Sequence, residues 1–430
     1  MILTYGILFI NNYLTLMVLT PMTQADADVS ENKSNSELLH HITLIIGLVC
    51  VGIGQTLLYT ILGPASREIG LTEFNVGMIV TIAALVITLC SGLWGKLIRI
   101  FGSRNSYLAG MIFYTIGTLI LALVLKISLS HYLSITSAFL ALLFVRCITG
   151  ALTAGIHPSA MTYIAESTDR KERGAGMALI ASAYGIGSVI GPLLGSSLGS
   201  FSLLLPIYVA AIVSFIGTVL GFMILSKNTI ESVSVSMEER RTIKINDKRV
   251  LPVFIGVALT YIAFSSFQQT ISFYIQDLFS LDPEKAVTET GITVSIMAVA
   301  MVFTQLVFIQ IFKPSSKLLL IFGSLICFLG FLGMISPYHY PLVINISSGL
   351  LGVGFGMMIP AIQSAASLAV SNEEQSGVAG FLFGASAFGY VLGPAIGTYL
   401  YSISPIYIFC FAISAIMLST YFTAKVIYKE

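Results

Sequence analysis

The chain has 430 residues, of which 56% are apolar, 11% are aromatic and only 10% are charged. Soluble domains carry about 25% charged residues, so this composition cannot build a water-facing surface of the required size and excludes a soluble enzyme. The net charge of +1 and the lack of a basic patch with interleaved aromatic residues exclude nucleic acid as a partner. The partner that the composition indicates is the lipid bilayer.

Apolar segments of about 20 residues, long enough to cross about 30 Å of hydrocarbon, recur along the chain. We expect an all-α polytopic membrane protein with twelve transmembrane helices in two six-helix bundles. The predicted spans are 42–62, 75–98, 106–125, 133–158, 175–199 and 204–225 in the first half, and 251–276, 291–312, 317–336, 340–368, 378–401 and 404–424 in the second. The predicted domains are an N-terminal bundle at 42–226, a cytoplasmic linker at 227–250, a C-terminal bundle at 251–425 and a tail at 426–430.

Residues 1–41 precede the first predicted span. The stretch 1–20 is apolar but lacks the positively charged start of a secretory signal, and a polar run follows at 24–37. It could be an extra span, a segment lying on the membrane surface, or translation from a start codon upstream of the natural one, with Met17 and Met22 as alternative starts. We expect a dispensable extension that lies outside the fold.

The distribution of Lys and Arg predicts the orientation, because cytoplasmic loops retain these residues. With both termini in the cytoplasm, 17 of the 21 Lys and Arg residues fall on the cytoplasmic side. Only Arg67, Lys126 and Lys285 fall outside, and Arg146 lies within the fourth span. We therefore expect a multi-pass protein of a bacterial cytoplasmic (inner) membrane with both termini inside.

A repeat relates the two halves at an offset of 202 residues. The segment 172–198, ERGAGMALIASAYGIGSVIGPLLGSSL, aligns without gaps on 374–400, EQSGVAGFLFGASAFGYVLGPAIGTYL, with eight identities in 27 positions. Parallel repeats of six spans place a substrate site between the halves, near the middle of the membrane. The pattern predicts a transporter.

Three short motifs resemble those of a known family. The segment 187–195, GSVIGPLLG, resembles an antiporter motif of the fifth span, and 146–150, RCITG, resembles an arginine motif of the fourth. The segment 95–104, GKLIRIFGSR, occupies the loop where the family carries Gly-x-x-x-Asp-x-x-Gly-x-Arg. On these residues the chain resembles the major facilitator superfamily over about 42–425, and most closely its drug:proton antiporter branch. The resemblance implies a secondary transporter whose spans one, four, seven and ten line the cavity.

The gate motif consists of Gly95, Arg99, Gly102 and Arg104. Arg99 stands where the family usually has Asp. By resemblance, that acid locks the cytoplasmic gate in one state, so this chain departs from the usual locking contact.

The antiporter motif also has a physical reading of its own. Gly187, Gly191 and Gly195 recur every four residues and line one helix face, where they let a neighbouring backbone approach closely. Pro192 removes a helix hydrogen bond and permits a bend. The second half repeats the pattern with Gly389, Gly393, Pro394 and Gly397. Matching bends suit two halves that rock about a central site, and plain helix packing is the alternative interpretation.

Arg146 is the most informative single residue of the sequence. A charge in the interior of a span costs at least about 2.5 kcal/mol, and no Asp or Glu falls within the predicted spans. Thr149 and Thr153 follow at helical spacing on the same side. We interpret Arg146 as a counter-charge for an anionic substrate group or a participant in proton coupling. The alternative is an arginine neutralised by helix carbonyls and by Gln or Tyr side chains.

Other polar residues within predicted spans fill out a candidate cavity wall. These candidates for substrate binding or coupling are Gln55, Tyr59, Gln268, Gln269, Tyr274 and Asn345. For any single glutamine, a hydrogen bond between helices is as good an interpretation as ligand contact.

Enzyme and cofactor chemistry find no support in the sequence. The five cysteines fall in different predicted spans without paired spacing, so neither a disulfide framework nor a metal site is indicated. No phosphate-binding Gly-x-x-x-x-Gly-Lys-Ser/Thr loop occurs. We expect no cofactor and no enzymatic activity.

These observations predict a monomeric secondary transporter that moves a small organic molecule by alternating access. The antiporter motif favours proton-coupled efflux. The alternative is uptake or export of an anionic metabolite or a siderophore-like carboxylate, by symport or facilitated diffusion. More distant alternatives are a non-transporting membrane receptor and a membrane enzyme.

Overall fold

The computed structural model describes residues 24–168, 173–226, 247, 249–337, 340–371 and 374–427. The start of the predicted N-terminal extension, most of the predicted linker and the last three residues of the tail lie outside the described residues. Helices and short connections make up the described part of the chain, and it contains no β-strand.

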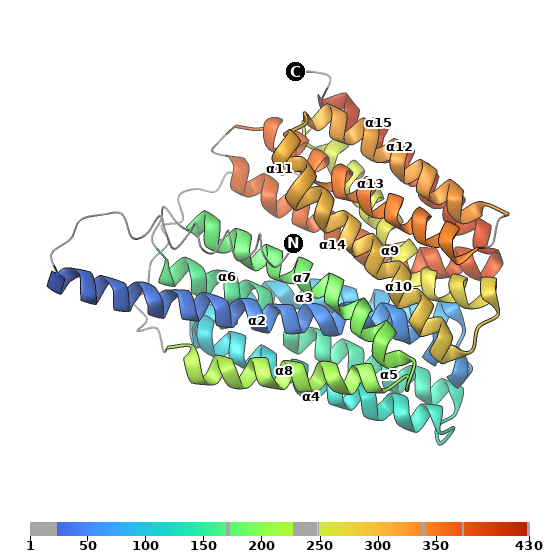
Figure 1. Ribbon diagram of the computed structural model, residues 1–430, viewed down its shortest axis with the longest axis horizontal. Helices are drawn as coiled ribbons and strands as arrows, with labels where there is room; N and C mark the ends of the chain where they lie inside the picture. Colours follow the sequence, from blue (N-terminus) through green and yellow to red (C-terminus); the bar gives the residue numbers. More distant parts are fainter. Residues whose placement is uncertain are drawn as a thin grey trace.

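The helices form two groups, which are coloured blue to green and yellow to red in Figure 1. The first group consists of α2 (Gln24–Ile69), α3 (Glu73–Phe101), α4 (Ser103–Leu129), α5 (Ile135–Thr153), α6 (Ile156–Ser167), α7 (Arg173–Gly199) and α8 (Leu205–Ile224). The second group consists of α9 (Leu251–Phe279), α10 (Pro283–Phe303), the π-helix η1 (Thr304–Phe308), α11 (Ile309–Phe312), α12 (Ser316–Ile335), α13 (Pro341–Leu368), α14 (Gln375–Ile403) and α15 (Pro405–Ile427).

Eleven helical stretches of the described chain are long and apolar enough to cross a membrane, judged by length and composition. The fifth predicted span, 175–199, lies within α7, in which Gly185–Gly199 is an apolar stretch. Large apolar side chains remain exposed on many of these helices, among them Leu89 at 68% and Phe144 at 66%. Such surface suits contact with lipid rather than water, and the predicted all-helical membrane fold is confirmed.

The first spanning helix is longer than the sequence suggested. Helix α2 begins at Gln24 and continues without interruption to Ile69, so the polar run at 24–37 extends this helix instead of lying apart from it. The polar residues at 24–37 led to a predicted span that starts only at residue 42, whereas the helix itself starts at Gln24.

Two other predicted spans are divided. The eighth passes from α10 through η1 into α11, and such π-helical turns are a recognised cause of bending. The fourth breaks between α5 and α6, at Ala154 and Gly155. There the indole Nε1 of Trp94 donates a hydrogen bond of 2.8 Å to the carbonyl of Ala151. In an unbroken helix the amide of Gly155 would bind that carbonyl, so Trp94 satisfies an acceptor that the break sets free.

The two groups touch each other at one end. Figure 1 shows their helices converging toward this end, which carries the α2–α3, α7–α8 and α9–α10 connections. Hydrogen bonds between the groups include those from Arg67 to Gln276 and Asp277, from the amide of Ala395 to Thr81, and from Thr288 to the carbonyl of Ser196. We term this the closed end.

Toward the opposite end, the helices that meet at the closed end lose contact with each other. A Cβ added to certain glycines of α3, α7 and α14 would meet no atom within 4 Å. These glycines are Gly92, Gly95, Gly185, Gly380 and Gly384. By contrast, a Cβ on Gly77 or Gly291, nearer the closed end, would collide with the other group. We term the opposite end the open end.

Candidate functional site

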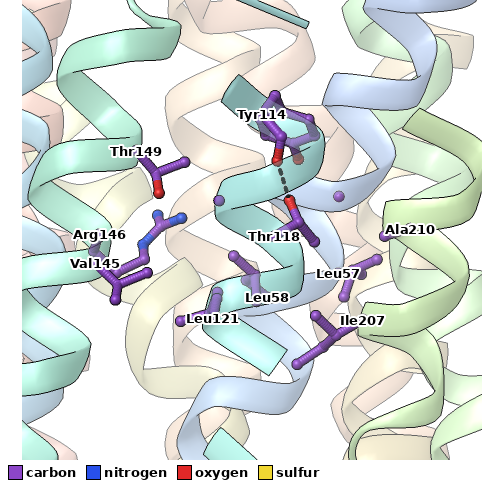
Figure 2. A pocket seen from close by; sticks show the side chains of 12 residues that line it. Leu57, Leu58, Tyr114, Thr118, Leu121, Val145, Arg146, Thr149, Ile207 and Ala210 are labelled. Atoms are coloured by element: carbon purple, nitrogen blue, oxygen red, sulfur yellow. Dashed lines mark hydrogen bonds between the residues drawn. The ribbon is translucent and has the colours of Figure 1, made fainter. Parts of the chain in front are cut away.

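Arg146 lies on α5, about 16 Å along the helix from its start at the closed end. Figure 2 shows its side chain directed from α5 toward α4 and α2, between Thr149 and Thr118. It lines a cavity of about 10 Å³, room for about one water molecule. The lining residues from α2, α4, α5 and α8 are Gly54, Leu57, Leu58, Tyr114, Gly117, Thr118, Leu121, Val145, Arg146, Thr149, Ile207 and Ala210. The guanidinium thus points into the first group of helices.

The charge of Arg146 has no acidic partner in this cavity. The lining contains no Asp or Glu, and the Nε atom is buried without a hydrogen-bond partner among the described residues. Tyr59 and Tyr114 are near enough to interact with it electrostatically. A buried donor without an acceptor typically costs about 1–3 kcal/mol, so Nε is the atom of this site most in need of an acceptor.

The two threonines that follow Arg146 are engaged locally. The hydroxyl of Thr153 donates to the carbonyl of Thr149 at 2.8 Å. Thr149 packs on Gly117 of α4, where an added Cβ would collide with the threonine side chain. Thr149 therefore fixes the distance between α5 and α4 beside the arginine.

The polar candidates of α2 and α9 differ in burial. Gln55 and Tyr59 on α2 are half-buried, whereas Gln268 and Gln269 on α9 are 8% and 1% exposed. The Oε1 atom of Gln269 is buried and has no hydrogen-bond partner in the described structure. A second polar atom in need of a partner therefore lies in the second group of helices.

Two further candidates are held by contacts inside the second group. The hydroxyl of Tyr274 donates to the carbonyl of Met334 at 2.5 Å, and its ring stacks edge-on against Phe409. Asn345 accepts a hydrogen bond of 2.8 Å from the hydroxyl of Thr293. In this structure both residues join helices of one group, and their assignment to a substrate site stays a prediction.

The gate motif lies where α3 meets α4 at the open end. Gly102 alone separates the two helices and adopts φ +80°, a conformation that favours glycine. Arg104 donates to the carbonyls of Leu225 at 2.6 Å and Phe222 at 3.3 Å, so it binds the carbonyls at the end of α8. Arg99 is exposed on α3, and Gly95 faces open space.

The glycine and proline motifs bring helices together within each group. A Cβ on Gly187, Gly191 or Gly195 of α7 would collide with α2. Likewise, a Cβ on Gly389, Gly393 or Gly397 of α14 would collide with α9. Pro192 and Pro394 lie inside these helices, beside the contacts between the groups. The motif residues therefore occupy equivalent places in the two halves.

Two residues with clear structural roles carry no motif in the sequence. Arg67 joins the two groups at the closed end, yet its partner Asp277 lies 210 residues away. Trp94 is the only tryptophan of the chain. Its uniqueness was the only sequence signal that could have pointed to its role at the α5–α6 break.

The chain matches the family model described as Major Facilitator Superfamily over residues 44–382. Multidrug resistance protein 2 of Bacillus subtilis is 23% identical over 394 residues, which cover 88% of this chain and 92% of that protein. Multidrug resistance protein 1 of the same organism is 26% identical, covering 86% and 91%. The quinolone resistance protein NorA of Staphylococcus aureus is 23% identical, covering 84% and 90%.

Solved structures with the same fold include two described as inward-facing. A bacterial homologue of the iron transporter ferroportin, in the inward-facing state, superposes with a TM-score of 0.67 at 14% identity and covers 90% of this chain and 98% of that one. A bacterial homologue of the human lysosomal transporter Spinster, inward-facing and occupied, gives 0.64 at 12% identity, covering 92% and 97%. The family match spans more than half of the chain, and the protein belongs to the major facilitator superfamily, whose members are membrane transporters and not enzymes.

Proposed function

We propose that this protein exports small organic molecules across the bacterial cytoplasmic membrane in exchange for protons. Relatives that align over most of the chain are named for multidrug, quinolone and tetracycline resistance, which supports efflux. We further propose that the protein works as a monomer with both termini in the cytoplasm. By the Lys and Arg distribution, the open end then faces the cytoplasm.

The observation that carries this proposal is the one-sided contact between the two groups of helices. Hydrogen bonds join them at the closed end. Toward the open end, a Cβ added to glycines of α3, α7 and α14 would meet no atom within 4 Å. This asymmetry supports a cycle in which contact alternates between the two ends. A substrate would then enter from the cytoplasm and leave after the closed end separates.

The substrate would bind at polar atoms that need partners, one within the first group of helices and one within the second. Arg146 and Gln269 each present a buried polar atom without a partner in the described structure. We propose that Gln55, Tyr59 and Gln268 complete this site from α2 and α9. The motif glycines of α7 and α14 shape these helices and need not touch the substrate.

A second candidate function is transport of an anionic metabolite, such as a siderophore-like carboxylate, in either direction. The unpartnered Nε of Arg146 favours it, because a carboxylate supplies both the missing acceptor and the missing negative charge.

Purified protein in proteoliposomes tests both candidates. Counterflow would be measured for a panel of fluoroquinolones, tetracyclines, carboxylates and siderophores, with and without an imposed pH gradient. Drug counterflow that a pH gradient accelerates supports proton-coupled efflux. Counterflow restricted to the carboxylates and siderophores supports the second function, and no counterflow for any member of the panel would contradict both.

A further inference from the structure

A cluster of charged groups fastens the two groups of helices at the closed end. Arg67 at the end of α2 donates to Asp277 on α9 through both terminal nitrogens, with distances of 2.5 Å to Oδ1 and 2.8 Å to Oδ2. The same guanidinium donates to Glu73 on α3 at 2.6 Å and 3.1 Å. Its carbon lies 5.0 Å from the centre of the Phe273 ring, also on α9. Arg67 is thus held between the two groups.

The two carboxylates of the cluster have different consequences for the fold. Glu73 and Arg67 both belong to the first group, so their ion pair does not join the groups. Asp277 belongs to the second group, and its Oδ2 also accepts a hydrogen bond of 2.6 Å from the hydroxyl of Tyr401 on α14. Among the ion pairs of the described residues, only Arg67–Asp277 crosses between the groups.

Opening of the closed end has to separate Arg67 from Asp277. A bidentate arginine–carboxylate pair is a strong, directional contact, and its strength depends on the negative charge of the acid. A proton on Asp277 removes that charge and converts one oxygen from acceptor to donor. Asp277 keeps 47% of its side chain exposed, so protons from the solution at the closed end can reach it directly.

Among the described residues near this end, no other charged group forms an ion pair that joins the two groups of helices. Of the other partners of this guanidinium, Glu73 lies in the first group, and Gln276 lies in the second but carries no charge. On α10, Lys285 pairs with Asp282 at 3.5 Å in an exposed i,i+3 contact. Glu68, next to Arg67, is exposed. Among the described residues, loss of the charge of Asp277 therefore leaves no second ion pair between the groups.

We propose that the carboxylate of Asp277 is a proton-binding site and that its protonation releases the closed end. The proton adds to a carboxylate oxygen, the two bonds from Arg67 weaken, and Arg67 stays paired with Glu73. Acid on the closed side then favours separation of the two groups there. This inference rests on the alternating movement in the proposed function and adds the residue through which protons act on it.

Distances between two spin labels at the closed end test this inference. Cysteines would replace the exposed Tyr132 of the α4–α5 connection and Tyr407 of α15, one in each group, after the five native cysteines are removed. With Asp277 present, acidification should raise the ratio of the long-distance to the short-distance population about fivefold, which corresponds to about 1 kcal/mol for a partly exposed ion pair.

Three variants give the comparison. Asp277→Asn should show the larger long-distance population already at neutral pH and lose the response to acid. Glu73→Gln removes a carboxylate of the same guanidinium but not the bond between the groups, so it should keep the response, as should Lys285→Gln. If Asp277→Asn does not fold, Arg67→Gln removes the same pair from the other side and should give the same result.

The outcomes separate this inference from the proposed transport. An unchanged response to acid in Asp277→Asn, or no response in the parent protein, overturns the proton site. The distances require no transported substrate, so a normal response together with absent counterflow overturns the transport proposal and keeps the proton site.

Discussion

The indole nitrogen of Trp94 donates a hydrogen bond of 2.8 Å to the carbonyl oxygen of Ala151, at the point where the fourth span changes from α5 to α6. The bond joins α3, which carries the gate motif, to the helix that carries Arg146. The Trp94 ring also packs on Gly155, where a Cβ would collide with it. One side chain therefore supports the break in the fourth span both by hydrogen bonding and by packing.

The first prediction concerns this contact. Trp94→Phe keeps an aromatic ring but removes the donor, and the partly buried carbonyl of Ala151 loses its partner. We expect a loss of about 1–3 kcal/mol in the free energy of unfolding, measured as a lower melting temperature in detergent. Leu93→Ala alters the neighbouring residue, which is 58% exposed, and should change stability much less. Equal melting temperatures for Trp94→Phe and the parent protein would contradict the role of the hydrogen bond.

A second prediction uses two glycines of the same helix. A Cβ on Gly191 would collide with the Ile53 carbonyl and the Thr56 side chain of α2, whereas a Cβ on Gly185 would meet nothing within 4 Å. Gly191→Ala should therefore destabilise the protein by about 1–3 kcal/mol through overpacking. Gly185→Ala should leave stability unchanged or slightly raised, because alanine favours helix. Thermal unfolding of the two variants side by side measures this difference in stability. Equal losses of melting temperature in Gly191→Ala and Gly185→Ala would refute the packing argument.

Hydropathy was enough to predict the membrane class and the helical fold, and the internal repeat was enough to predict a transporter. The family was predicted from the resemblance of three short motifs. The repeat also singled out Gly191 and Gly393, which occupy equivalent contacts in the two groups. These features can be read from sequence because span length and glycine spacing are properties of a single helix. The start of α2 at Gln24 and the break at Gly155 escaped prediction because hydropathy reports burial in lipid and does not report helix continuity.

The ion pair at the closed end could not be predicted in the same way. Arg67 and Asp277 are 210 residues apart, and each resembles an ordinary charged residue at the end of a span. Only the packing of α2 against α9 brings them together. Similarly, the sequence placed Arg146 inside a span but did not indicate that its side chain points toward α4 and α2 (Figure 2).

The third prediction concerns the gate motif. Arg99 is exposed near the end of α3, at the position where the family usually carries an acid that locks the gate. Arg99→Asp restores that acid and should shift the protein toward closure of the open end. Labelling of a cysteine introduced at Gly384, where an added Cβ would meet no atom within 4 Å, should become slower. Lys96→Asp adds the same charge to another exposed position of α3 and serves as the control; if it slows labelling equally, the position of the acid is irrelevant.

A fourth prediction follows from an ion pair at the open end. Arg249 donates hydrogen bonds of 3.0 Å to both oxygens of Glu374, and these bonds hold the pKa of Glu374 below its ordinary value. The stabilisation is therefore present above the ordinary pKa and is lost as the pH falls through the lowered pKa of the folded protein. Arg249→Gln should lower the melting temperature slightly near neutral pH and have less effect in acid. A difference that grows in acid would contradict the assignment.

The most direct measurement of the central claim is counterflow of the transported compound through Arg146→Ala in proteoliposomes. The Nε atom of Arg146 is buried without a partner, and the described lining of its cavity contains no acidic residue, so removal of this side chain should leave the protein folded, as size-exclusion chromatography and melting temperature would show. We predict that Arg146→Ala abolishes counterflow, whereas Lys126→Gln, a change to an exposed charge of α4, preserves it. Unchanged counterflow in folded Arg146→Ala would contradict the claim that this arginine serves transport.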